Sequence, residues 1–133
     1  MPANTTGATD WRELREFAAA DLTQSFVLSW DMESGILVVD VDLFLTPEHP
    51  FYEEPRPAER VCIRPAVIEF PLCEAIESDK IQAGPDPTAA VAQLGHGAID
   101  GVRRLADGRY EISGAFGVVL VDAERPLMRL KGP

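Results

Sequence analysis

The sequence predicts a mainly β protein, at the border of the α+β class. Its strongly curled antiparallel sheet is expected to close as a small barrel or a sandwich. Two observations carry this prediction. Several segments alternate apolar and polar residues with a period of two, as half-buried strands do. Tight turn sequences such as Asp107–Gly108 lie between them, and tight turns join antiparallel neighbours. About six or seven strands are expected from this pattern.

The chain of 133 residues is long enough for one domain with one core. Residues 1–9 are expected to form a disordered tail, and residues 10–133 a single β-rich domain. The tail has neither the basic start nor the apolar stretch of an export signal. No apolar run approaches the roughly 20 residues that cross a bilayer. A cytoplasmic protein is therefore expected.

A helix over residues 10–20 is the first expected element. Asp10 and Glu13 resemble a capping box, with an acid at the cap and another three residues later. The apolar residues that follow share one helix face at three- and four-residue spacing, namely Trp11, Leu14, Phe17 and Ala18.

Two strands, residues 25–31 and 36–45, are expected to pair as a hairpin. In the first strand, the side expected to face the core carries Phe26, Leu28 and Trp30. In the second strand, the side with the opposite parity to the core residues carries Asp40, Asp42 and Phe44. Residues 46–58 contain four prolines, which exclude a central strand and predict a stiff surface loop.

The next strand is expected over residues 59–70, with a β-bulge or bend at Pro65, because its apolar residues change parity there. Residues 71–85 remain open between a short strand and an irregular crossing. Asp86 as a cap, Pro87 at the first helical position and Gly95 after the end predict a short helix over residues 87–94.

The last third predicts sheet again. A strand over residues 96–105 is followed by the turn at Asp107–Gly108. Unbroken even-numbered parity then predicts one long strand over residues 109–122, bent at its glycines. A final short strand over residues 127–131 is expected at a sheet edge, where two copies of the chain could pair as a homodimer.

The formal net charge of −10 is concentrated in the first part of the chain. Residues 1–80 hold 16 acidic and 6 basic residues, whereas residues 81–133 hold 6 of each. Such a charge disfavours nucleic acid and anionic membranes, which are bound through Lys and Arg. It is compatible with a basic protein partner, and also with a surface that only keeps the protein soluble.

No spacing of residues predicts catalysis, a metal site or a cofactor. His49 and the nearby carboxylates have no ligand geometry that the sequence defines. Cys62 and Cys73 match neither a zinc motif nor a redox pair, and free thiols are expected. Enzyme activity, whether dependent on a metal or on a thiol, is therefore the least favoured class.

The leading hypothesis is a small acidic intracellular module that binds or inhibits a protein partner, as immunity proteins do. An apolar centre with an acidic rim is the anatomy of a protein-binding surface. An apolar-ligand-binding β-barrel is the alternative, and it would need a hollow interior. The candidate interaction surface lies on the strand and loop between residues 40 and 54, and comprises Asp40, Asp42, Phe44, Glu48, His49, Phe51, Tyr52, Glu53 and Glu54.

Overall fold

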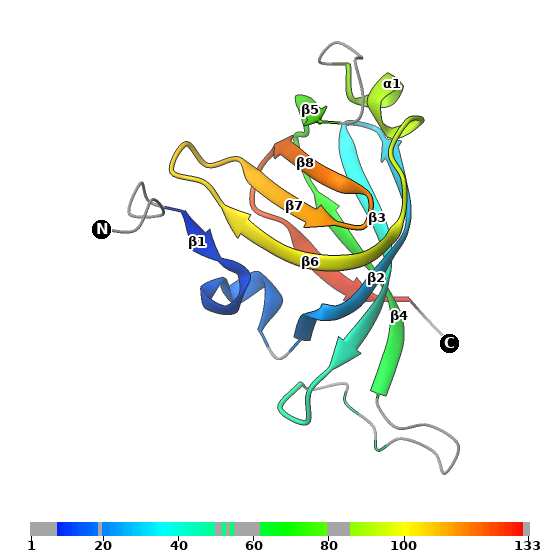
Figure 1. Ribbon diagram of the computed structural model, residues 1–133, viewed down its shortest axis with the longest axis vertical. Helices are drawn as coiled ribbons and strands as arrows, with labels where there is room; N and C mark the ends of the chain where they lie inside the picture. The colour runs from blue at the N-terminus through cyan, green and yellow to red at the C-terminus, as the bar shows by residue number, and fades with distance from the viewer. Residues whose placement is uncertain are drawn as a thin grey trace.

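The computed structural model describes residues 8–18, 20–49, 52, 54, 62–79 and 86–131. Within them the chain forms one nine-stranded sheet with little helix, and every recorded strand pair is antiparallel (Figure 1). The predicted antiparallel β class is confirmed. The strands are β1 (Thr9–Asp10), β2 (Ala20–Glu33), β3 (Ile36–Leu45), β4 (Cys62–Phe70), β5 (Ala75–Ser78), β6 (Gly97–Arg104), β7 (Tyr110–Gly114), β8 (Gly117–Asp122) and β9 (Leu127–Leu130).

The strand order is β5-β8-β7-β6-β2-β3-β4-β9, with β1 paired to β6. In the described part of the chain the two ends of this path, β5 and β9, are not paired with each other, so the sheet is open. The expected strong curling into a closed barrel is therefore not supported. A sheet closes into a barrel only when its two terminal strands pair with each other. Here β5 and β9 have four residues each, and β5 pairs with β8 whereas β9 pairs with β4.

The N-terminal segment is not the expected helix. Two short 3-10 turns, η2 (Trp11–Glu13) and η3 (Arg15–Phe17), are separated by Leu14 in an extended conformation, and β2 already starts at Ala20. The Asp10 side chain caps η2 as predicted, accepting from the backbone N–H of Arg12 at 3.1 Å. Helices of this length depend on tertiary contacts, and here burial of Trp11 and Phe17 in the core decides the path of the chain.

Strand β4 runs without the bulge predicted at Pro65. Its register against β3 is unbroken from Cys62 to Phe70, with Pro65 opposite Asp42. The backbone N–H of Lys131 donates to the Pro65 carbonyl oxygen at 3.0 Å, so the backbone groups of Pro65 face β9. Proline has no backbone N–H, but at this position that group would point toward β9, so the β3–β4 ladder loses no hydrogen bond.

The helix predicted over residues 87–94 is present but shorter, as α1 (Pro87–Val91). Asp86 caps it as expected, accepting from the backbone N–H of Thr88 at 3.1 Å. The segment left open in the sequence contains β5. The long strand predicted over residues 109–122 is instead the hairpin β7–β8, in which Gly114 pairs with Gly117 around a two-residue turn.

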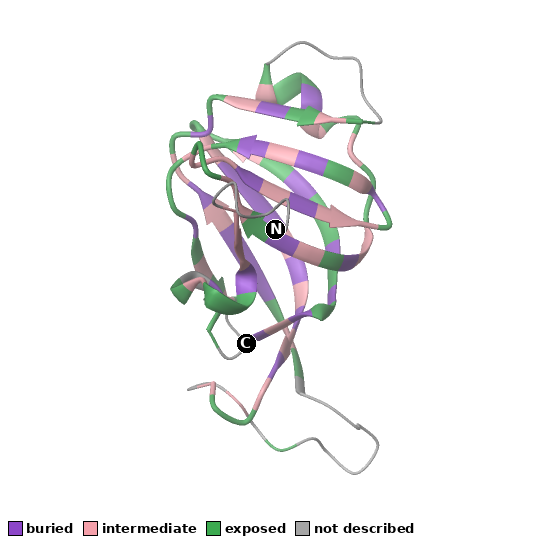
Figure 2. Ribbon diagram, turned by 60° about the vertical axis from the view of Figure 1, so that its left-hand side comes forward, coloured by how far each residue is buried: buried purple, intermediate pink, exposed green. Residues whose placement is uncertain are grey.

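The core lies between two halves of the sheet, one formed by β5, β8, β7 and β6 and the other by β2, β3, β4 and β9. Buried positions recur along the strands of both halves (Figure 2). Two edge-to-face ring contacts help to pack it. Trp30 of β2 meets Phe116 of the β7–β8 turn with ring centroids 5.3 Å apart, and Phe70 of β4 meets Tyr110 of β7 at 5.4 Å. Aromatic contacts thus connect strands that are distant in the sequence.

Candidate functional site

The side of the sheet that faces away from the core along β2, β3 and β4 carries three of the sequence-predicted residues, Asp40, Asp42 and Phe44. All three are half-buried, whereas the alternate residues of β3 are buried in the core. The register places Asp42 between Phe26 of β2 and Pro65 of β4, and Phe44 opposite Ile63 of β4. We call this the outer face.

Four large apolar side chains gather on the outer face near the end of β3. Phe26 is 44% exposed, Leu28 is 47% exposed and Ile63 is 38% exposed, while Phe44 is half-buried. We refer to Phe26, Leu28, Phe44 and Ile63 as the outer patch. Directly opposed residues on antiparallel strands have Cβ atoms about 5 Å apart, so Phe44 and Ile63 are neighbours. Exposed apolar side chains that cluster are the usual sign of a binding surface.

The sequence prediction placed Phe26 and Leu28 in the core, and this was wrong. The pairing of β2 with β3 shifts twice, between Asp21 and Phe26 and again between Val27 and Ser29. Each irregularity changes which residues face the core. Val27 and Trp30 are both buried although their numbers differ in parity, because the second irregularity lies between them.

Ser25 holds the first irregularity of β2. Its buried Oγ donates to the Asp21 carbonyl oxygen at 2.9 Å and accepts from the backbone N–H of Phe44 at 3.0 Å. A side-chain hydroxyl thus replaces a ladder bond that the backbone alone cannot make there. Phe26, the next residue, is consequently directed to the outer face.

We expect Ser25→Ala to lower the free energy of unfolding by about 1–3 kcal/mol, because it leaves the buried Phe44 N–H without an acceptor. Urea denaturation would measure the loss, and hydrogen exchange at the Phe44 amide would locate it. Ser29→Ala is the matched control, since the Ser29 hydroxyl is exposed and bonds only an Asp40 carboxylate oxygen at 2.9 Å. Equal stability of the two variants would contradict this account of the bulge.

Asp40 is already neutralised within the chain. The Lys131 ammonium lies 2.7 Å from its carboxylate, and the Ser29 hydroxyl donates to it at 2.9 Å. Burial opposes ionisation of Asp40, but the hydrogen bonds from Lys131 and Ser29 outweigh that effect and lower its pKa. Asp40 therefore closes one border of the outer patch as part of an internal ion pair.

Asp42 differs from Asp40 in having no such partner. No hydrogen bond or ion pair reaches its carboxylate from the described residues. Its cross-strand neighbours, Phe26 and Pro65, offer no donor either. The outer patch thus has an unpaired carboxylate among apolar side chains.

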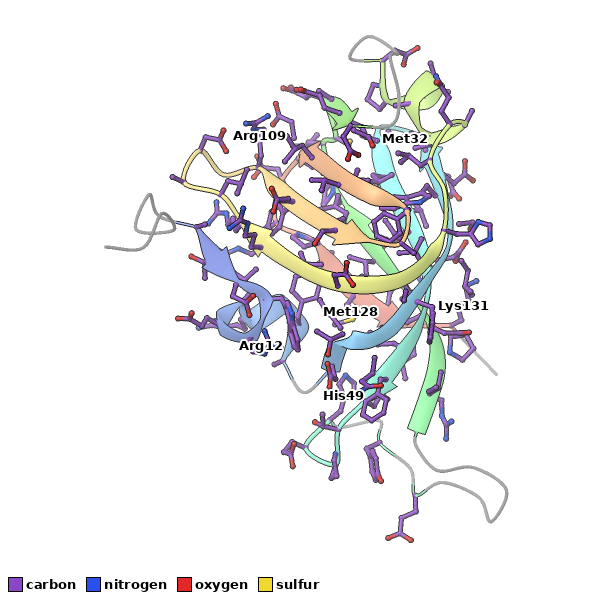
Figure 3. All side chains as sticks on the ribbon, viewed as in Figure 1. Arg12, Met32, His49, Arg109, Met128 and Lys131 are labelled. Atoms are coloured by element: carbon purple, nitrogen blue, oxygen red, sulfur yellow. The ribbon has the colours of Figure 1, made fainter. Side chains whose placement is uncertain are left out.

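The loop after β3 supplies the other predicted residues. Glu48 and Glu54 are exposed, and Tyr52 packs against the hydrophobic core. His49 lies just beyond the end of β3 (Figure 3), and its burial lowers its pKa. Phe51 and Glu53 lie outside the described residues.

The described residues give little support to a metal site or a reactive thiol. No group of three His, Cys, Asp or Glu side chains there is placed to hold a metal ion. Burial is the main cause that raises the pKa of the Cys73 thiol to about 11, so this free cysteine stays protonated at neutral pH. The side chain of Cys62 is outside the described set.

An open hollow of about 360 Å³ lies between the segment after α1 and the β7–β8 turn. Its lining is mixed, with polar side chains of Ser78, Gln93 and His96 beside Leu94 and Phe116. The Trp30 indole N–H donates to the Gly95 carbonyl oxygen at 2.6 Å and fixes one wall. The hollow is not an enclosed apolar cavity of the kind that an apolar-ligand carrier requires.

The fold and the outer patch together define an open antiparallel β-sheet protein with an acidic and apolar candidate interface. No family model matches the chain, and no match is found among curated proteins or solved structures. None of the helices in the described segments has the length and apolar character needed to cross a membrane.

Proposed function

We propose that this protein is a small acidic intracellular module that binds, and thereby inhibits or sequesters, a basic protein partner. The outer patch and the acidic residues beside it form the binding surface. The observation that carries the proposal is the exposure of Phe26, Leu28 and Ile63 on the face of a regular sheet. The isolated fold leaves these side chains exposed to water, whereas contact with a partner would bury them.

Charge supports a basic partner. Asp42 lies within the patch, Asp31 lies further along the same face of β2, and Glu48 is exposed in the loop that follows β3. A net charge of −10 attracts a cationic protein over long range and accelerates encounter at low salt. An apolar centre surrounded by charge is the usual arrangement of a transient interface.

The packing of the interior supports this proposal over an apolar-ligand carrier. Four aromatic side chains were expected to line a ligand cavity if one existed; Phe26 lies on the outer face instead, and the other three are Trp30, Tyr110 and Phe116. All three are buried, and each makes a ring-to-ring contact within the core. Space between the sheet halves at these positions is therefore occupied by side chains.

The proposal predicts that basic cytosolic proteins are retained by the immobilised wild-type chain and lost from the double variant Phe26→Ser/Leu28→Ser. Retention should fall steeply when salt rises from 50 to 500 mM, because the charged rim is screened. Quantitative mass spectrometry of the retained proteins at both salt concentrations measures both effects.

Leu127→Ser is the matched control, since Leu127 is an exposed leucine of the edge strand β9 and does not belong to the outer patch. It should retain the same proteins as the wild type. Retained proteins with no basic bias, or equal retention by the double variant, would refute the proposal.

A further inference from the structure

Apolar residues lie on both sides of Asp42 across the neighbouring strands of the outer face. The register puts it directly opposite Phe26 on one side and Pro65 on the other. Phe44 lies two residues along the same strand and on the same face, a displacement of about 7 Å along β3. A cation that bonds the Asp42 carboxylate would therefore also lie near two phenyl rings.

Asp40, the other carboxylate in this part of β3, is not available to bind an incoming cation. It is held by Lys131 and Ser29, so a second cation there would meet the Lys131 charge. Among the described residues, no hydrogen bond or ion pair brings a cation to Asp42. A partly buried carboxylate beside apolar side chains is costly to leave unpaired, and an incoming cation removes that cost.

We propose that Asp42, Phe26 and Phe44 form a subsite for one arginine side chain of the basic partner. This inference rests on the proposed function and adds the chemistry of the contact. A guanidinium can form two parallel hydrogen bonds with the carboxylate, and its flat faces can stack on aromatic rings. Its aliphatic stem packs against apolar surface such as Ile63.

Arginine fits this place better than lysine. An ammonium is a compact and strongly hydrated charge, and it would lose water on entering the patch without gaining a stacking contact. A guanidinium is more weakly hydrated and interacts favourably with a ring within about 6 Å. The subsite should therefore prefer arginine over lysine, and both over a neutral side chain of similar length.

The test uses the full-length ¹⁵N-labelled protein and three probes, the methyl esters of N-acetyl-arginine, N-acetyl-lysine and N-acetyl-norleucine. The arginine ester should shift the amide signals of Phe26, Asp42 and Phe44 saturably, more strongly than the lysine ester. The norleucine ester should cause little change. Equal shifts with all three probes would overturn the subsite.

Asp42→Asn should weaken arginine-ester binding about tenfold, because a charge-assisted hydrogen-bonded pair is lost. Asp31→Asn is the control, since it removes the same charge from the same face of the sheet and should change affinity less than twofold. Phe26→Leu keeps an apolar side chain but removes the ring, and should weaken arginine binding about two- to fivefold without affecting the norleucine ester. Thermal melts verify that each variant is folded.

The results separate this inference from the proposed function. Basic proteins that are retained through the outer patch, together with an arginine probe that is indifferent to Asp42→Asn, would overturn the subsite and leave the binding module intact. Saturable binding of the arginine probe that depends on Asp42 would support the subsite, even where the retained proteins show no dependence on Phe26 and Leu28 and the proposed function fails.

Discussion

Gly114→Ala is expected to lower the free energy of unfolding by about 2–3 kcal/mol, one of the two largest effects we predict. A Cβ at this position would collide with the Ala98 carbonyl oxygen and would lie 2.7 Å from a ring carbon of Phe116. Neither group can move freely. The Ala98 carbonyl accepts from the Ala115 N–H at 2.9 Å, and the Phe116 ring packs on Trp30.

Gly101→Ala is the matched control for this variant. Gly101 belongs to β6, which pairs with the strand of Gly114, and a Cβ added there meets no atom within 4 Å. Its stability should stay within about 0.5 kcal/mol of the wild type, as for substitutions away from special features. Chemical denaturation of both variants measures the difference, and similar stabilities would show that the β7–β8 turn yields easily.

Phe70→Ala is expected to have the largest effect, a loss of about 3–5 kcal/mol in the free energy of unfolding. Phe70 is fully buried, and its ring meets Tyr110 edge to face across the two halves of the sheet. Truncation removes this contact and leaves a cavity that the neighbouring strands cannot fill without breaking their ladders. Folded proteins are in general only marginally stable, so this variant is expected to populate unfolded states at 37 °C.

Phe26→Ala is the informative control for Phe70→Ala, because it truncates the same side chain on the outer face. Phe26 is 44% exposed, and its removal should cost less than about 1 kcal/mol. Denaturation curves of the two variants give the comparison. A large loss for Phe26→Ala would mean that this ring stabilises the fold, and its exposure would then not indicate a binding role.

The candidate site depends on two aspartates that differ in their ion-pair and hydrogen-bond partners. Asp40 and Asp42 are two positions apart on one strand and are indistinguishable in the alternating pattern of the sequence. The structure separates them through Lys131, which follows β9 and reaches Asp40 but not Asp42. Because this partner is about ninety residues away along the chain, no local pattern could have identified which carboxylate was free.

Local sequence signals predicted some elements of the fold correctly, whereas tertiary contacts determined others. Turn and cap residues act over a few positions, so the hairpin at Asp107–Gly108 and the cap at Asp86 were correctly predicted, although the turn is longer than the two residues expected because Leu105 bonds to Arg109 across residues 106–108. The N-terminal helix and the single strand over residues 109–122 were not. In both segments the pattern was compatible with the predicted element, and packing of Trp11 and Phe17, or the close approach of Gly114 to Ala98, selected another.

The sequence by itself determined the antiparallel β class, the acidic charge, and the alternation along β3 that leaves Asp40, Asp42 and Phe44 outside the core. These properties depend on residue types and short spacings. Only the tertiary structure decided that Phe26, Leu28 and Ile63 join them on the outer face. The physical reason is that a bulge arises from pairing between strands: β2 shifts its register against β3 at two places, and at the first of them the Ser25 hydroxyl bonds a backbone amide nineteen residues away.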